Sequence, residues 1–315
     1  MKSLVVGGAG FVGAYLIQEL KKESGEIYVT KMAGETIAGS DVQVMDLDIL
    51  DRGSIEKTLA EIRPDYIYHL AAQSSVAVSW QKPEITVDVN IKGAVNLLEA
   101  VRKEAPNARV LLIGSGEEYG HIHENEIPVI EDNPLRPGNI YAATKACQNM
   151  LGRIYADAYH LQIMMVRAFN HIGPNQAPIF VVADFCKQVA EIEAGRREPV
   201  IRVGNLSAKR DFTDVRDVVR AYTLLMKYGK IGCTYNVGSG RAVAIEEILQ
   251  MILEESKVQI EVQVDEERLR PVDVPMIVAD VSQLQQCTGW KPEIELRETL
   301  VETLGYWRDK VQGIM

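Results

Sequence analysis

The chain has 315 residues, of which 47% are apolar and 25% are charged, a composition typical of a soluble globular protein. Its net charge of −10 argues against binding to nucleic acid or to an anionic membrane surface. The N-terminal apolar run is broken by glycines, which is untypical of a signal peptide, and no stretch approaches the roughly 20 apolar residues that cross a bilayer. We therefore expect a cytoplasmic protein with neither nucleic-acid nor membrane partners.

The spacing of cysteines and histidines does not indicate a metal site or a disulfide framework. The four cysteines are scattered along the chain without a CxxC pattern. His121 and His123 form an HxH pair in a polar stretch, where solvated side chains are more common than metal ligands. We expect no metal.

The first half of the chain alternates strand patterns with helix patterns, as in βαβ units. Apolar residues recur at helical spacing between the predicted strands. The strands are predicted at residues 2–6, 26–30, 42–45, 65–70, 108–113 and 161–166. Their near-continuous apolar character suits a sheet covered on both faces, which predicts an α/β fold with a doubly wound parallel (Rossmann) sheet.

The second half of the chain has a looser pattern. A loop, "FNHIGPNQAP", precedes a predicted helix at about 181–194, and residues 234–240 are predicted to return to the main sheet as a strand. A helix at about 245–255 and a strand at 258–264 follow. We expect a Rossmann domain of residues 1–169 plus about 211–238. A smaller interleaved substrate domain would comprise about 170–210 plus 239–315.

A glycine-rich segment, "VVGGAGFVG", lies between the first strand and the first helix. Gly7, Gly10 and Gly13 allow a tight turn and a close approach of the backbone to a pyrophosphate, which the N-terminus of the following helix attracts. Glycine-rich turns are common, but this position in a βα unit indicates a dinucleotide site that also includes Phe11 and Val12.

The end of the second strand bears on the cofactor's ribose. An acid there accepts hydrogen bonds from the 2′-hydroxyl of NAD, whereas this chain has Thr30, Lys31 and Met32. Lys31 is suited to a 2′-phosphate, which favours NADP over NAD, although a solvated turn residue is the alternative. Asp48 and Ile49, after the third strand, are expected to flank the adenine.

Candidate catalytic residues follow the fifth strand. Tyr141 and Lys145, in "YAATK", lie one turn apart on a helix, where a cation favours an ionised phenol and prepares a general acid or base. Tyr306 and Lys310 repeat the spacing, but a surface pair is the better interpretation there. In "GSGEEY", strand alternation would place Ser115 and Glu117 on one side and turn Glu118 towards solvent.

Together, the glycine loop, "HLAAQSSV" (69–76), Ser115, the Tyr141/Lys145 pair and "RAFNHIGP" (167–174) resemble the extended short-chain dehydrogenase/reductases over essentially the whole chain. Residues 203–217 and 269–275 resemble the branch that acts on GDP-mannose-derived sugars, which contains a 4,6-dehydratase and a 4-keto reductase. The resemblance implies a homodimer formed through helices at about 86–104 and 141–159.

The resemblance also implies roles for individual residues. Ser115 would hydrogen-bond the oxygen at C4 of the sugar, Tyr141 would exchange a proton with it, and Lys145 would hold the nicotinamide ribose. Arginines would clamp the substrate diphosphate bidentately. The cofactor contacts would further include Leu70, Ala71, Ala72, Gln73 and His171, and the substrate contacts Ser74, Asn170, Val181, Lys187, Arg210, Arg270 and Asp273.

Dehydratases of the branch have Thr-Ser-Glu where this chain has Ser115-Gly116-Glu117. They also have Gly-Gln-Asp-Gly in the phosphate loop, and paired arginines where Asn175 and Gln176 stand here. A reductase must release its cofactor at each turnover, so the loss of cofactor-gripping arginines favours a reductase of a GDP-6-deoxy-4-keto-hexose that uses NADP or NAD. The alternatives are a GDP-mannose 4,6-dehydratase or another nucleotide-sugar epimerase/dehydratase. A non-catalytic NAD(P)-binding regulator is a more distant alternative.

Overall fold

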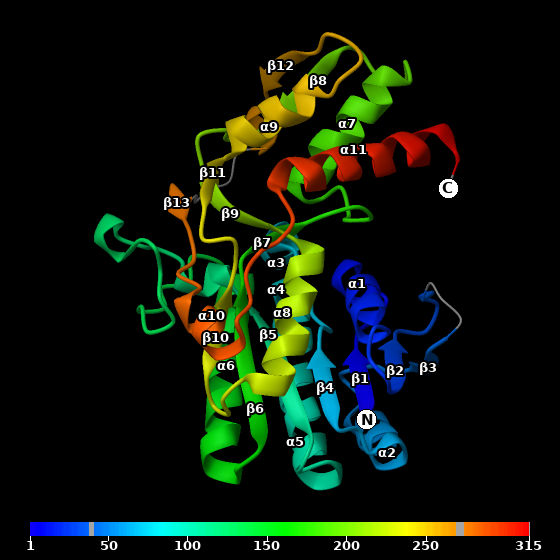
Figure 1. Cartoon of the computed structure of the whole chain (residues 1–315), viewed down its shortest axis with the longest axis vertical. Coiled ribbons are helices and arrows are strands. Elements are labelled where there is room, and N and C mark those ends of the chain that lie inside the picture. The colour runs from blue at the N-terminus through cyan, green and yellow to red at the C-terminus, as the bar shows by residue number, and fades with distance from the viewer. Residues whose placement is uncertain (38–40, 269–273, 315) are drawn as a thin grey trace.

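The computed structural model describes residues 1–37, 41–268 and 274–314. A seven-stranded sheet forms the larger part of the fold (Figure 1), and each neighbouring pair of its strands is parallel. In spatial order the strands are β10 (Thr234–Val237), β6 (Gln162–Ala168), β5 (Arg109–Ser115), β4 (Tyr66–His69), β1 (Lys2–Val6), β2 (Glu26–Lys31) and β3 (Gln43–Asp46).

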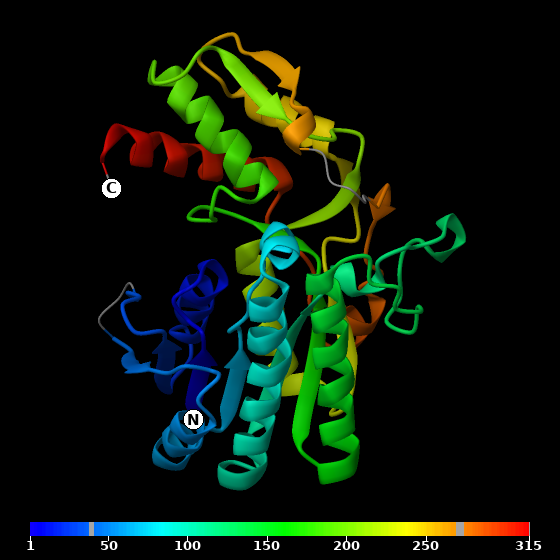
Figure 2. The ribbon, with the colours of Figure 1, turned by 180° about the vertical axis from the view of Figure 1, so that it is seen from behind.

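Helices cover both faces of this sheet. One face carries α2 (Arg52–Ile62), α5 (Gly93–Glu104) and α6 (Ile140–Tyr159), of which α5 and α6 lie in front in Figure 2. The other face carries α1 (Phe11–Leu20) and α8 (Val215–Tyr228), with α10 (Ser282–Thr288) beside α8. The doubly wound parallel sheet predicted from the sequence is therefore confirmed.

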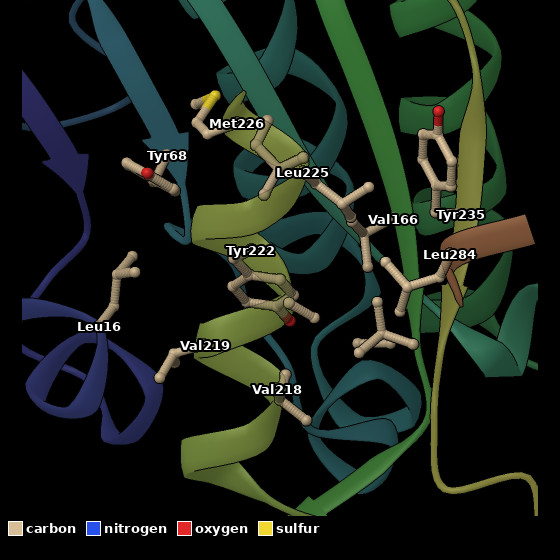
Figure 3. Close-up of a cluster of buried hydrophobic side chains, with 14 of the residues drawn as sticks. Leu16, Tyr68, Val166, Val218, Val219, Tyr222, Leu225, Met226, Tyr235 and Leu284 are labelled. Carbon is tan, nitrogen blue, oxygen red and sulfur yellow. The ribbon is translucent and has the colours of Figure 1, made fainter. Parts of the chain in front are cut away.

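The core between α8 and the sheet shows why the strands are almost continuously apolar. Figure 3 shows Tyr222 and Leu225 of α8 between Leu16 of α1 and Val166 of β6, and all four side chains are buried. On the other face, α2, α5 and α6 bury a second apolar cluster. Burial on both faces leaves few strand positions for polar residues.

A second, smaller unit lies above the carboxyl ends of the main strands (Figure 1). One of its sheets contains β7 (Asn170–Ile172), β9 (Lys209–Asp214), β11 (Ala242–Ala244) and β13 (Met276–Ile277), and the other pairs β8 (Val200–Val203) with β12 (Glu261–Val264). The helices α7 (Val181–Glu193), α9 (Ile245–Glu254) and α11 (Leu296–Gln312) share its apolar core. Because β9 belongs to this unit, the chain returns to the main sheet at α8, a few residues later than expected from the sequence.

The remaining helical segments are short. They are α3 (Val76–Gln81), α4 (Pro83–Val87), the π-helical η1 (Asp88–Lys92), and the 3₁₀ segments η2 (Gly116–Tyr119), η3 (Glu124–Glu126) and η4 (Glu266–Arg268). Across the described ranges, no helix is long and apolar enough to cross a membrane.

The connections between the two units are short. Only Phe169 separates β6 of the main sheet from β7 of the second unit. Asp214 ends β9 and also caps α8, because its Oδ1 accepts a hydrogen bond from the Arg216 backbone N–H at 2.7 Å. The second unit is therefore joined directly to the carboxyl end of β6 and to the start of α8.

Candidate functional site

A cavity of about 1210 Å³ is lined by residues of both units. It includes the carboxyl ends of several parallel strands, where ligands bind in doubly wound folds. Most residues singled out in the sequence line it, and they are Gly7, Gly10, Phe11, Val12, Gly13, Thr30, Lys31, Asp48, Ile49, Leu70, Ala71, Ala72, Ser74, Ser115, Glu117, Tyr141, Lys145, Asn170, His171, Val181 and Arg210.

Four of the expected site residues are not placed in this cavity. Gln73 donates from Nε2 to Thr86 Oγ1 at 2.9 Å and does not line the cavity. Lys187 lies on α7, 3.6 Å from a Glu191 carboxylate oxygen, and does not line it either. Arg270 and Asp273 lie outside the described residues.

The glycine loop has the geometry that a pyrophosphate requires. A Cβ at Gly7, whose φ is +82°, would lie 2.6 Å from Ala71 Cα, and one at Gly13 would lie 2.2 Å from the Gly8 carbonyl oxygen. No side chain caps α1, whose first turn lines the cavity, and a Cβ at Gly10 would meet nothing within 4 Å. The helix N–H groups are thus open to an anionic ligand.

Ser115, Tyr141 and Glu117 are brought together where β5 ends and α6 begins. Asn139 caps α6 by accepting from the Ala142 N–H at 2.8 Å, and its Nδ2 donates to Glu117 Oε2 at 3.2 Å. The Ser115 hydroxyl oxygen accepts from the Glu117 N–H at 3.2 Å. Because that bond uses only one of the oxygen's two lone pairs, the Ser115 hydroxyl can form a further hydrogen bond, with Tyr141 or with a ligand.

The protonation state of Tyr141 differs from the expectation that a nearby cation favours an ionised phenol. Burial raises the pKa of Tyr141 above its usual value, and the nearby Glu117 and Glu118 raise it further, whereas a hydrogen bond with Ser115 opposes the shift. Lys145, one turn further along α6, is buried as well. Its Nζ donates to the Ile113 carbonyl at 2.7 Å, and burial lowers its own pKa to about 8. Tyr141 is therefore held as a neutral phenol that can donate a proton.

The expectation that Glu118 points to solvent is wrong. Its side chain is fully buried, with Oε2 2.9 Å from Arg167 Nε and Oε1 accepting from the Ser115 N–H at 2.9 Å. The reason is that strand geometry stops at Ser115, because residues 116–119 form a 3₁₀ helix in which alternation no longer applies. Gly114 leaves room for the carboxylate, since a Cβ there would lie 2.2 Å from Glu118 Oε1.

The comparison with known protein families decides the affiliation. The family model described as GDP-mannose 4,6 dehydratase matches residues 4–303, nearly the whole chain. The chain belongs to this family. The GDP-6-deoxy-D-mannose reductase of Pseudomonas aeruginosa is 32% identical to it over 84% of this chain and 87% of the relative. The GDP-mannose 4,6-dehydratase of Yersinia enterocolitica is 26% identical over 96% and 92%.

Solved structures agree with this membership. The structure of RMD from Pseudomonas aeruginosa complexed with NADPH has a TM-score of 0.87 at 30% identity and covers 98% of this chain and 100% of that chain. The UDP-glucose 4-epimerase of Thermus thermophilus, in complex with NAD, has a TM-score of 0.88 at 30% identity, covering 98% and 99%. The expected extended short-chain dehydrogenase/reductase affiliation is confirmed, and with it an NAD(P)-dependent enzyme of nucleotide-sugar metabolism.

The cavity also contains residues that the sequence analysis did not assign. Asn139 was detectable, because an asparagine directly before "IYAATK" is a preferred helix N-cap. Gln176 is buried and donates to the His171 carbonyl at 2.9 Å, while its Oε1 has no partner within the described part of the chain. By contrast, Asn175 accepts from the Tyr306 hydroxyl at 2.8 Å, and neither Tyr306 nor Lys310 lines the cavity.

Proposed function

We propose that this protein reduces the C4 ketone of a GDP-linked 6-deoxy-4-keto-hexose with NADPH or NADH, giving a GDP-rhamnose type product. The observation that carries the proposal is the turn after β5. A Cβ at Gly116 would lie 3.1 Å from the Phe169 ring, so the middle polar residue of the dehydratases' Thr-Ser-Glu turn would be crowded here. The turn keeps the Ser115 hydroxyl, and α6 places the protonated phenol of Tyr141 beside it; these are the groups that ketone reduction needs.

The mechanism follows from the protonation of these residues. The bound nicotinamide, when reduced, supplies the hydride that adds to C4. The Ser115 hydroxyl donates a hydrogen bond to the C4 oxygen, and Tyr141 gives that oxygen its phenolic proton as negative charge develops. Lys145, as a cation next to the phenolate so formed, stabilises it until a proton returns from solvent.

The ligand groups are assigned to the two ends of the cavity. The glycine loop and the first turn of α1 would hold the cofactor's pyrophosphate. Arg210, on β9, lies in the cavity and is nine-tenths buried; together with Arg270 it would pair with the substrate diphosphate, assisted by Asn170. Asp273 would accept from the ribose of the substrate nucleotide. His171, stacked on Phe11 at 6.2 Å between ring centroids, would line the cofactor.

A dehydratase is the second candidate because Glu117 lines the cavity, hydrogen-bonded to Asn139. Its carboxylate is the kind of group that removes the C5 proton and protonates the departing C6 hydroxyl. The two functions are separated by incubating the protein with GDP-mannose alone, and with the 4-keto-6-deoxy derivative plus NADPH or NADH. Ketone reduction without dehydration of GDP-mannose supports the proposal, and conversion of GDP-mannose to the ketosugar overturns it.

We further infer a cytoplasmic homodimer. Met150 and Ile154, one turn apart on the outer side of α6, are 54% and 55% exposed, which suits a helical interface between two copies. No disulfide joins the cysteines of the described residues, as befits a reducing compartment. Light scattering at micromolar concentration should give twice the chain mass, and a Met150→Glu/Ile154→Glu variant should give the mass of one chain. A wild-type monomer contradicts the inference.

A further inference from the structure

The carboxyl end of β2 and the residues that follow β3 line one part of the cavity, and an ion pair joins the ends of the two strands. Lys31 and Asp46 are the last residues of these strands and are partners in the sheet register. Lys31 Nζ lies 2.5 Å from Asp46 Oδ1, and Lys31 lines the cavity whereas Asp46 does not. The lysine that the sequence offers to a 2′-phosphate therefore already has a carboxylate partner, supplied by the neighbouring strand.

An acid also reaches this strand end from a position that the sequence pattern does not reveal. Glu35 lies beyond the end of β2, yet its Oε2 accepts from the Met32 N–H, the first backbone donor after the strand, at 2.8 Å. Glu35 lines the cavity as well. A carboxylate has two oxygens and several lone pairs, so Glu35 can still accept from a ribose hydroxyl at this strand end.

The charges at this end oppose a 2′-phosphate. A phosphate close to Lys31 would also lie close to the carboxylates of Asp46 and Glu35, and like charges at short range repel. The other cations that line the cavity within the described ranges lie on different elements. They are Lys145 on α6, Arg210 on β9, and Arg268, whose Nη1 lies 2.5 Å from Asp184 Oδ2 of α7.

We propose that this site selects NADH over NADPH. Glu35 accepts a hydrogen bond from the 2′-hydroxyl of the adenosine ribose, and Asp46 keeps Lys31 from neutralising a 2′-phosphate. Both acids are specificity determinants that act on the adenosine half of the cofactor. The inference rests on the dinucleotide binding of the proposed function and not on the sugar chemistry.

The test is a calorimetric titration of the wild-type protein with NADH and NADPH, and with 5′-AMP and adenosine 2′,5′-bisphosphate. We expect NADH to bind roughly tenfold more tightly than NADPH, and 5′-AMP to bind at least as tightly as the bisphosphate. Tighter binding of NADPH and of the bisphosphate overturns the inference and leaves the proposed reduction intact. If neither NADH nor NADPH binds, both this inference and the proposed function are wrong.

Variants identify the groups responsible. The double variant Asp46→Asn/Glu35→Gln should bring the NADH-to-NADPH affinity ratio to one or below, and Glu35→Gln alone should weaken NADH severalfold. The matched control for Glu35→Gln is Glu19→Gln, which likewise removes one negative charge. This variant should leave the ratio within about twofold of wild type, since the Glu19 carboxylate is paired with Lys22 and does not line the cavity. An equal shift in the control assigns the effect to net charge and contradicts the proposal.

Discussion

The buried ion pair between Glu118 and Arg167 lies at the turn of residues 115–119, which carries Ser115. It gives a quantitative prediction. Glu118 is fully buried and Arg167 is 6% exposed, so neither charge is solvated if its partner is removed. The Arg167 guanidinium also donates from Nη1 to the Tyr119 hydroxyl at 3.0 Å and to the Glu131 carbonyl at 2.7 Å. Glu118→Ala would leave this guanidinium in place without its counter-charge. Breaking such a buried pair costs about 3–5 kcal/mol of unfolding free energy.

A double-mutant cycle in urea measures this. Glu118→Ala and Arg167→Met should each lower the unfolding free energy by about 3–5 kcal/mol, whereas the double variant should lose less than the sum of the two, because no unpaired charge remains. The control pair is Arg153 and Asp157 on α6, whose side chains are 59% and 62% exposed, and removing either should cost less than about 1 kcal/mol. Additive losses in the cycle, or a single-variant loss as small as the control's, would refute the reasoning.

Three predictions concern the proposed catalytic residues directly. Tyr141→Phe should lower turnover by roughly 100-fold while cofactor affinity, measured by titration, stays within a few-fold, since only the proton donor is lost; near-normal turnover would assign the donor to another group. Glu117→Gln should keep most ketone reduction in a coupled NAD(P)H assay, because reduction removes no C5 proton, and loss of all reduction would show that the carboxylate is needed. Turnover should fall as pH rises through about 8, where Lys145 loses its proton; a pH–rate profile that stays flat to pH 10 contradicts a cationic Lys145.

Sequence patterns predict the main sheet because each of its strands is recognisable from the apolar residues within its own segment. Segments such as 108–113 are apolar on both strand faces, which only a strand between two helical layers explains, and β5 has that position. Residues 234–240 are also predicted to return to the sheet as a strand, and β10 (Thr234–Val237) pairs there with β6. The glycine loop follows β1 and Ser115 ends β5, so both lie at the carboxyl ends of parallel strands, and the first turns of α6 bring Tyr141 and Lys145 to the same cavity.

The helices at 181–194 and 245–255 match α7 and α9, but the sheet of the second unit that contains β9 and the buried contacts of Glu118 could not be predicted this way. β9 reads "KRDFTD", a polar stretch, yet Asp211 within it is fully buried because Ser239, Gly240 and Ala279 donate hydrogen bonds to its carboxylate. These donors are distant in sequence, so hydrophobic periodicity contains no trace of the pairing. Glu118 is a similar case, since its burial depends on Arg167 and on the end of the strand at Ser115.

The single residue between β6 and β7 has a consequence for how ligands enter and leave. Phe169 is 4% exposed and packs against the backbone at Gly116, so a rotation of one unit against the other at this junction would push on the turn that holds Ser115. The helix α8 follows β9 directly. Wide opening of the two units would thus deform the catalytic groups at every cycle. If segments at the rim of the cavity moved instead, cofactor and product could exchange while Tyr141 and Ser115 kept their relative positions.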